Sequence, residues 1–386
     1  MNAPKLRFKE FNDEWLKKEL REISQIYDGT HQTPDYIHNG VPFVSVEDIS
    51  DIEKTNKFIS KNAFEKEFKI KPQVNDILMT RITAGIIGTT AIVKNNGPLG
   101  YYVSLALIRK NNEIDVNYLN QYINCFKFKK ELNKRIIHVA FPKKINLRDI
   151  GKCKISITSI NEQQKIGKTL SLLDKKIELQ SRKIEDLKLF KKGLKECEFS
   201  NLDCKEISLS EILKERKTYS EKGLEFPHVT LSKDGIYDKG DRYNRDFLVK
   251  SDDKKYKITY LNDLCYNPAN LKFGVICLNE YGSAIFSPIY VTFIIKDIAN
   301  PVYIKYYVTR NNFINAIRKY EQGTVYERMA VSPKDFLKFS IKLPHIEIQN
   351  KIVAKLSKLD KKIELEELRL IKLNELKKGL MQNMFV

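Results

Sequence analysis

The sequence LSLLDKKIELQSRKIEDLKLFKKGL occupies residues 170–194, and LSKLDKKIELEELRLIKLNELKKGL follows 186 positions later, at residues 356–380. The two stretches align without a gap and are identical at 14 of 25 positions. Similarity at a fixed period indicates one structural unit used twice. A shared Lys and Leu composition explains part of the identity, but it does not explain a register held over about seven helical turns.

Both stretches have the apolar spacing of a coiled coil, in which steps of three and four residues alternate. The segment from Glu162 to Lys195 lacks proline, and at 1.5 Å per residue it predicts a helix of roughly 50 Å. A polar residue, Gln180 in one copy and Glu366 in the other, interrupts each seam and is expected to fix the register. Two such helices are expected to pair with each other, antiparallel, as spacers; alternatively, each packs on its own domain. The apolar positions are Ile166, Leu170, Leu173, Ile177, Ile184, Leu187, Phe190 and Leu194, and then Ile352, Leu356, Leu359, Ile363, Leu370, Leu373, Leu376 and Leu380.

The repetition extends, more weakly, into the region before each helix. Leu20-x-Glu22-Ile23 corresponds to Leu209-x-Glu211-Ile212, and Asn75-Asp76-Ile77 corresponds to Asn262-Asp263-Leu264. The copies agree at apolar and turn positions and differ at most polar ones, which is typical of a common scaffold that carries two different surfaces. Short β-rich runs, followed by an amphipathic helix at about 117–134 or 301–320, predict a mixed domain in each copy.

The predicted fold class is therefore α+β. Two mixed α/β domains are joined by two long antiparallel coiled-coil spacer helices, and the whole is a pseudo-twofold internal duplication. The predicted segments are a first domain over 1–155, a central spacer helix within 156–200, a second domain over 201–341 and a C-terminal spacer helix within 342–386.

Composition narrows the class of partner. The chain has a formal net charge of +19 spread evenly along its length, which suits a polyanion such as nucleic acid, although a Lys-rich composition also follows from an AT-rich genome. No apolar run approaches the roughly 18 residues that a spanning helix needs, so we expect a soluble cytoplasmic protein without membrane contact. The six cysteines and five histidines show no metal-ligand spacing, so no metal site is predicted.

A polar, basic loop precedes each spacer, and a second candidate loop lies earlier in each domain. Arginine beside aromatic and small polar residues is suited to base edges and phosphates. The candidate DNA-binding residues are Arg81, Thr83, Lys134, Arg135, His138, Lys143, Lys144 and Arg148 in the first domain, and Asn267, Asn270, Lys272, Arg318, Lys319, Thr324, Tyr326, Arg328 and Lys334 in the second.

Motifs for catalysis are missing from the sequence. Adenine methyltransferases hold the flipped base with an Asp or Asn, two prolines and an aromatic residue in succession, whereas Asn267-Pro268-Ala269-Asn270 lacks the second proline and the ring. There is neither a phosphate-binding G-x4-G-K-[ST] nor a glycine-rich turn that opens a helix. We therefore predict no catalytic residue and no bound cofactor.

With this order of domain, long helix, domain and long helix, the chain resembles the DNA-specificity subunits of type I restriction–modification systems over essentially its full length. The most specific similarity is the start of the spacer, Asn161-Glu162-Gln163-Gln164-Lys165-Ile166. The second copy departs from it, because Ile348 and Asn350 replace the Glu and Gln. The domain opening Phe11-Asn12-Asp13-Glu14-Trp15 also looks familial.

The resemblance implies a non-catalytic subunit with two target-recognition domains, each reading one half of a bipartite double-stranded DNA site. It also implies two docked methyltransferase subunits that flip and methylate adenine at N6, and restriction or translocase subunits that join them. S-adenosylmethionine and ATP would then be bound by the partner subunits. The alternative is a coiled-coil interaction scaffold that binds protein or RNA partners.

Overall fold

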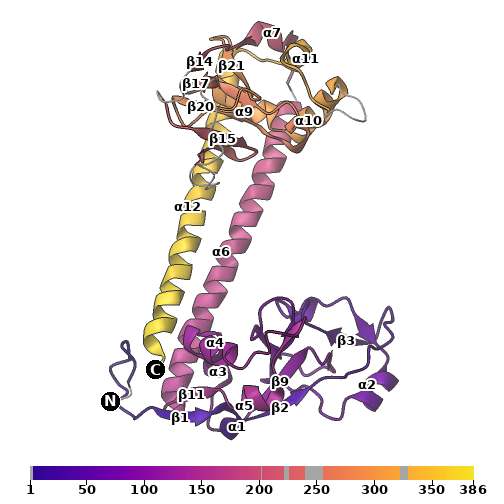
Figure 1. The fold of residues 1–386 in the computed structure, drawn as a ribbon, viewed down its shortest axis with the longest axis vertical. Helices are drawn as coiled ribbons and strands as arrows, with labels where there is room; N and C mark the ends of the chain where they lie inside the picture. Colours follow the sequence, from indigo (N-terminus) through magenta and orange to yellow (C-terminus); the bar gives the residue numbers. More distant parts are fainter. Residues whose placement is uncertain (1–2, 201, 221–225, 240–254, 322–328) are drawn as a thin grey trace. The chain divides into compact units, whose positions relative to one another are not determined.

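The structure is a computed structural model, and it describes residues 3–200, 202–220, 226–239, 255–321 and 329–386. The chain divides into two compact units, each consisting of one domain and parts of two long helices (Figure 1). Unit 1 comprises Met1–Arg182 and Glu367–Val386, and unit 2 comprises Lys183–Glu366.

The domain of unit 1 is built on an antiparallel four-stranded sheet in the order β2-β9-β5-β7. A three-stranded sheet, β4-β3-β8, and the pairs β1-β11 and β6-β10 complete it. The elements are β1 Leu16–Glu19, α1 Leu20–Ile23, β2 Ser24–Asp28, β3 Val41–Val44, η1 Ile52–Lys54, β4 Phe58–Ile59, α2 Lys61–Glu67, β5 Ile77–Thr80, β6 Ile82–Thr83, β7 Thr90–Ile92, β8 Gly100–Tyr101, β9 Leu105–Lys110, α3 Val116–Asn124, α4 Phe126–Asn133, β10 Lys143–Lys144, α5 Leu147–Gly151 and β11 Lys154–Ile157.

Unit 2 repeats this plan. Its four-stranded sheet, β13-β21-β18-β19, has the same order of equivalent strands, and β12-β22 corresponds to β1-β11. The elements are β12 Glu206–Ser208, α7 Leu209–Ile212, β13 Leu213–Glu215, β14 Tyr219–Ser220, β15 Val229–Ser232, β16 Gly235–Asp238, β17 Tyr256–Thr259, β18 Leu264–Tyr266, η3 Leu271–Phe273, β19 Ile276–Leu278, β20 Ala284–Phe286, β21 Val291–Ile295, α9 Pro301–Val308, α10 Asn311–Ile317, η4 Arg318–Tyr320, α11 Pro333–Lys338 and β22 Ser340–Lys342.

The short motifs shared by the two copies have structural roles. Asn75 and Asn262 both adopt positive φ, 73° and 68°, in the turns that enter β5 and β18. The next residue, Asp76 or Asp263, is buried and forms an ion pair with an arginine at 2.7 or 2.8 Å. These polar residues were retained in both copies because the turn and its buried carboxylate need them.

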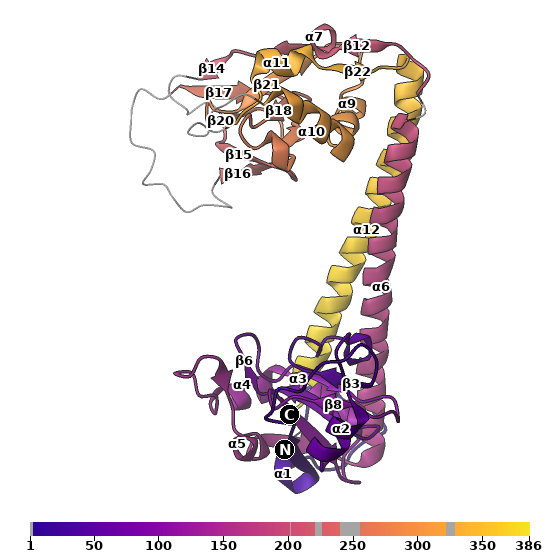
Figure 2. The ribbon, with the colours of Figure 1, turned by 90° about the vertical axis from the view of Figure 1, so that its right-hand side faces the viewer.

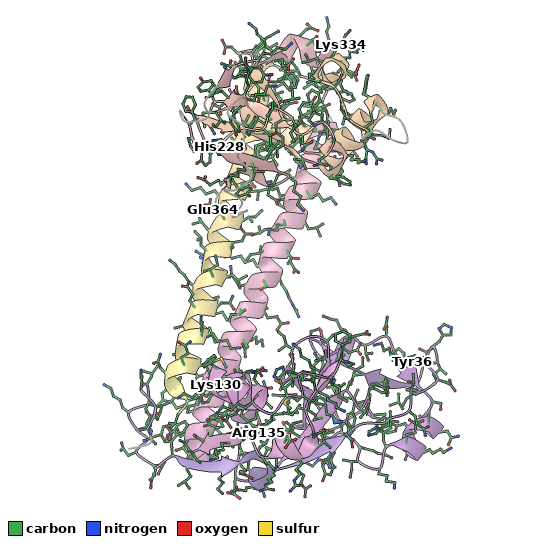
Figure 3. All side chains as sticks on the ribbon, viewed as in Figure 1. Tyr36, Lys130, Arg135, His228, Lys334 and Glu364 are labelled. Atoms are coloured by element: carbon green, nitrogen blue, oxygen red, sulfur yellow. The ribbon has the colours of Figure 1, made fainter. Side chains whose placement is uncertain are left out.

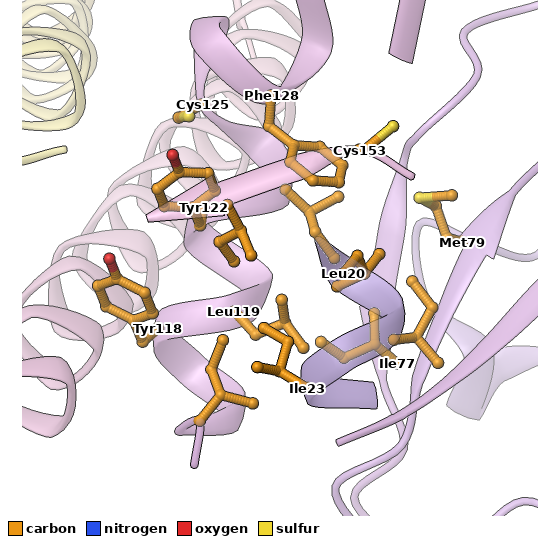
Figure 4. Packing of buried hydrophobic residues seen from close by; sticks show 14 of the residues in the cluster. Leu20, Ile23, Ile77, Met79, Tyr118, Leu119, Tyr122, Cys125, Phe128 and Cys153 are labelled. Atoms are coloured by element: carbon orange, nitrogen blue, oxygen red, sulfur yellow. The ribbon is translucent and has the colours of Figure 1, made fainter. Parts of the chain in front are cut away.

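The single helix predicted at about 117–134 is in fact two helices, α3 and α4. The backbone at Cys125 is extended and separates them, and α9 and α10 are separated in the same way in unit 2. The change of direction lets both helices face one core. Figure 4 shows Tyr118 and Tyr122 of α3 and Phe128 of α4 converging with Leu20 of α1 in that core.

The long helices are α6, Ile160–Ser200, and α12, Ile346–Met384, with 41 and 39 residues. Within unit 2 they pair in opposite directions, since Lys183 contacts Glu366 at 2.7 Å and Lys355 contacts Glu198 at 2.7 Å. Glu366 is 4% exposed, so it is the buried polar seam residue that the sequence predicted. The α+β class and the paired spacer helices are confirmed.

One part of the seam prediction is wrong. Phe190 and Leu376 are 60% and 52% exposed and lie off the seam. The seam positions are instead their neighbours Lys191 and Lys377, which form ion pairs with Asp360 and Asp174, respectively. A heptad step of four from Leu187 reaches Lys191, so the periodicity holds while the residue at that step is charged.

A buried glutamine fixes each domain to the beginning of its own helix. The amide of Gln163 accepts a hydrogen bond from the Asp115 backbone N–H at 3.0 Å and donates to the carbonyls of Thr158 at 2.7 Å and Glu113 at 3.0 Å. Gln349 makes the equivalent three bonds in unit 2 at 2.8, 2.8 and 3.2 Å. The shared glutamine therefore links the first turn of the long helix to the start of α3 or α9.

A phenylalanine at the end of the other long helix fixes each domain a second time. Phe385, near the end of α12, packs against Tyr122 of α3 with ring centroids 5.1 Å apart. Phe199, 186 positions earlier, packs against Tyr303 of α9 at the same distance of 5.1 Å. Each domain is thus held by the beginning of one spacer and the end of the other.

Candidate nucleic-acid interface

The two candidate loops of unit 1 lie side by side. We call residues 81–88 the β6 loop and residues 134–148 the β10 loop. Lys143 and Lys144 pair with Thr83 and Ile82 in a short antiparallel ribbon, and the Ile145 N–H donates to the Arg81 carbonyl at 3.0 Å. Segments about 60 residues apart in the sequence thereby lie side by side, and Figure 2 labels β6 close to α4.

Unit 2 joins its two loops in the same way. The Val331 N–H donates to the Pro268 carbonyl at 3.2 Å, which brings residues 329–332, just before α11, to residues 267–274, the η3 loop. Gly88 and Gly274 end the equivalent loops with φ of 87° and 79°, a conformation that glycine adopts without strain. A Cβ at Gly88 would also lie 2.7 Å from Leu132.

The residue that opens each of these two loops is buried and has a structural role. Arg81 donates through Nε to the Val103 carbonyl at 3.1 Å, and burial lowers the pKa of its guanidinium. Asn267 accepts hydrogen bonds from the backbone N–H groups of Ala269 at 3.1 Å and Asn270 at 3.2 Å. These two sequence-predicted residues shape their loops, and their DNA contacts stay a prediction.

A hollow lies between α4 and the two loops of unit 1. Its volume is about 600 Å³, and its lining includes His138 and Lys143 from the candidate set. Lys129 and Lys130 of α4 also line it, and sequence reasoning missed both. The alternation of aromatic and basic residues in Phe126-Lys-Phe-Lys-Lys130 was the available signal. Because Lys129 is largely buried, its pKa is lowered to about 8, and its ammonium donates to the Gly88 carbonyl.

Three other candidates of unit 1 lie away from the hollow's lining. Lys134 and Arg135 form ion pairs with Glu131 at 2.7 and 2.8 Å, and these hydrogen bonds hold the pKa of the Glu131 carboxyl below its usual range. Arg148 is exposed on α5 and lines a separate hollow of about 430 Å³ beside Tyr27. Lys130 and Arg135 are labelled in Figure 3.

Unit 2 presents fewer described candidates. Lys272 lies over the ring of Phe273 at 5.4 Å, and that phenyl group is exposed on the η3 loop together with Asn270. Lys319 and Lys334 are exposed, and Arg318 lies 3.9 Å from Glu321. Lys334, on α11 and labelled in Figure 3, corresponds in the repeat to Arg148 on α5, 186 positions earlier. The candidates Thr324, Tyr326 and Arg328 lie outside the described residues.

A family model described as the type I restriction modification DNA specificity domain matches residues 12–189 and again residues 201–375. The chain belongs to this family. As a specificity subunit it is DNA-binding and contains two target-recognition domains; catalysis is not the role of this subunit. This membership favours DNA over the protein or RNA partners of the scaffold alternative.

The relatives of this specificity subunit agree with that assignment. A putative type I restriction enzyme MjaX specificity subunit from Methanocaldococcus jannaschii is 29% identical over 205 residues, 50% of this chain and 47% of that protein. The match thus spans about half the length of this curated relative. The crystal structure of a type I restriction–modification S subunit from M. genitalium has the same fold, with a TM-score of 0.61, 15% identity and coverage of 100% and 99% of the two chains.

A further chain, from a structural study of complex assembly and conformational transition of the type I system, has a TM-score of 0.57, 13% identity and coverage of 96% and 97%. Within the described part of the specificity subunit, no group of His, Cys, Asp and Glu residues is arranged to hold a metal ion. None of the described helices is long and apolar enough to cross a membrane.

Proposed function

We propose that each target-recognition domain reads one half of a bipartite DNA site and that the paired helices fix the gap between the halves. Two methyltransferase subunits would dock on this chain and methylate adenine at N6. Translocase subunits would join them for restriction. S-adenosylmethionine and ATP would be bound by those partners. This function requires access to chromosomal and incoming DNA, so we expect the chain in the cytoplasm.

The observation that carries the proposal is a pair of equivalent loops that share backbone bonds and differ in side chains. The bond from Ile145 to Arg81 recurs as the bond from Val331 to Pro268. At equivalent positions, however, Lys143 and Lys144 are replaced by Met329 and Ala330. A retained framework with exchanged surface chemistry is what two readers of different half-sites need, because base choice depends on the side chains that reach the groove.

Exchange of loops within this chain tests the assignment. Residues 267–274 are grafted in place of residues 81–88, and residues 320–334 in place of residues 134–148; each graft has the length of the segment it replaces. Methylome sequencing of cells with the wild-type gene, and of cells without it, gives the starting motif. In the grafted chain we expect one half-site to change toward the other half-site, which itself stays the same.

The reverse graft, from unit 1 into unit 2, is the matched control and should change the opposite half. A motif that is unchanged by both grafts, or one that changes in both halves with either graft, contradicts the assignment of base reading to these loops. The expectation that Arg328→Ala relaxes one half-site remains a prediction from the sequence.

A lysine in the same surface should act on the phosphates. With the methyltransferase subunits bound, Lys143→Ala should weaken binding to every duplex alike and reduce the slope of log K against log salt by about one. Lys61→Ala, which removes an exposed lysine of α2 in the same unit, is the control and should leave the slope unchanged. A change of motif in Lys143→Ala would show instead that this lysine reads a base.

A further inference from the structure

The tip of the β10 loop carries two apolar side chains in water. Val139 is 97% exposed and Phe141 is 90% exposed, more than any other large apolar residue in the described part of the chain. They stand two positions apart, with His138 and Pro142 on either side, and both of these are exposed as well. Transfer of a phenyl group out of water is favourable, so this arrangement favours a ligand that covers it.

The base of this loop is held firmly. The Ile137 N–H donates to the Lys144 carbonyl at 2.8 Å, and the β6-β10 pairing continues from there. The His138 ring lies in hydrogen-bond contact with the Asn133 carbonyl at 3.2 Å. The tip is therefore part of an eight-residue loop, Ile137 to Lys144, whose two ends are hydrogen-bonded to each other. These ends lose little conformational freedom on binding.

The charges around the tip identify the class of ligand. Residues 134–148 contain five Lys and Arg residues and no Asp or Glu. Lys143 and Lys144 next to the tip are exposed, and Lys129 and Lys130 line the adjoining hollow. An apolar tip beside the exposed Lys143 and Lys144 fits a polyanion with apolar faces inside, which describes stacked base pairs between phosphate chains.

We propose that Phe141, with Val139 beside it, inserts between base pairs of the half-site read by unit 1 and unstacks the duplex there. Apolar wedges of this kind partly open a base step and kink the helix, and pyrimidine–purine steps open most readily. Unit 1 then reads the deformability of a step in addition to base edges. This inference rests on the proposed function, because it needs unit 1 to bind one half-site.

The test uses the complex with methyltransferase subunits and a duplex with 2-aminopurine placed at successive steps of each half-site. The adenine that is methylated is left unlabelled, because its flipping would also raise fluorescence. We expect the wild type to raise fluorescence at one step of the unit 1 half-site. Phe141→Ala should abolish the rise and weaken specific binding roughly 5- to 150-fold, the range for loss of one aromatic–base stack.

Two variants control for other causes. Phe141→Leu keeps an apolar wedge and should retain most of the fluorescence rise. Phe190→Ala removes another exposed phenyl group, on the long helix α6 and outside both candidate loops, and it should leave the rise intact.

The possible outcomes separate the two proposals. If the wild type prefers no sequence, the proposed function fails. If the wild type binds its site specifically but no step unstacks, or if Phe141→Ala keeps both the rise and the affinity, the wedge is overturned and the function stands. If Phe141→Ala loses the methyltransferase subunits on size-exclusion chromatography, the tip binds protein and the wedge is equally overturned.

Discussion

At the scale of single residues, the contacts at the start of each spacer helix explain why the two copies differ there. Glu162 is fully buried because Arg7 binds it with two hydrogen bonds of 2.8 and 2.7 Å, and Thr158 donates to it at 2.6 Å. Ile348, at the equivalent position of the second copy, is exposed instead. The sequence comparison showed the replacement, but its reason required the structure, since Arg7 is distant in sequence from Glu162.

Gln163, next to Glu162, has an equivalent in Gln349 of the second copy. We predict that replacing either glutamine lowers the free energy of unfolding by a similar amount. Gln163→Leu leaves the Asp115 N–H and two carbonyls without partners, and Gln349→Leu does the same in unit 2. A buried unsatisfied group costs about 1–3 kcal/mol, and only one of the three bonds in each unit is fully buried, so each variant should lose roughly 2–5 kcal/mol in urea unfolding. Gln164→Leu, which replaces an exposed neighbour, should cost less than about 0.5 kcal/mol. A large difference between the two buried glutamines would contradict their equivalence.

Lys129 predicts a pH dependence of stability. Its folded-state pKa of about 8 is below the unfolded value, so between these pKa values the unfolded state binds more protons and stability rises with pH. Lys129→Met should remove this rise between about pH 8 and 10 and should stabilise the fold by roughly 1–3 kcal/mol at pH 7. Lys130→Met, at the exposed next position, is the control for both effects. If the stability of Lys129→Met still rises with pH over this range, Lys129 is not the source of the pH dependence.

At the scale of elements, periodicity identified the long helices but did not identify the break in the shorter helix predicted before the first of them. The seam was visible as repeated apolar residues, and it failed only where a lysine takes an apolar position, at Lys191 and Lys377. The division of one predicted helix into α3 and α4 left no such signal, because Cys125 is neither proline nor glycine. The break depends on packing against a core that sequence periodicity does not describe.

The helix ends offer a matched pair of variants. Phe385→Ala removes a fully buried ring from the α3 surface, and Phe199→Ala removes its counterpart from α9. Each should cost about 3–5 kcal/mol, as for other buried phenylalanines. Hydrogen exchange should rise in α3 for the first variant and in α9 for the second, whereas the exposed Phe190→Ala should change neither. Equal effects of one variant on both helices would contradict local anchoring.

At the scale of the whole molecule, the internal repeat predicted two similar domains and two helices, and the family match agrees with this. The repeat also led to the candidate loops, and the structure joined them in pairs. It could not separate Arg81, which is turned inward, from Lys143, which is exposed, because both are basic residues in polar loops. Burial of a side chain depends on contacts made across the fold.

Spacing between half-sites should follow the length of both helices together. We predict that one extra heptad after Leu179 and another after Leu365, at equivalent positions, lengthens the non-specific gap while both half-sites stay the same. Seven residues add about 10 Å, or roughly two to three base pairs. Methylome sequencing gives the new motif directly. A heptad added to α6 alone shifts one helix against the other and should lower stability, and an unchanged gap in the double insertion would rule out the helices as the spacer.

The two phenylalanines at the helix ends also bear on how such a chain arises. Phe199 belongs to the first copy and covers the tyrosines of the second domain, while Phe385 belongs to the second copy and covers those of the first. In one copy alone, the tyrosines of its domain would therefore be exposed, and the phenylalanine at the end of its helix would have no domain to pack against. Two half-length polypeptides could make both contacts if each packed its last helical turn on the domain of the other, which is domain swapping between identical protomers. Fusion of two such polypeptides into one chain would keep both contacts while the sequences of the two halves diverge.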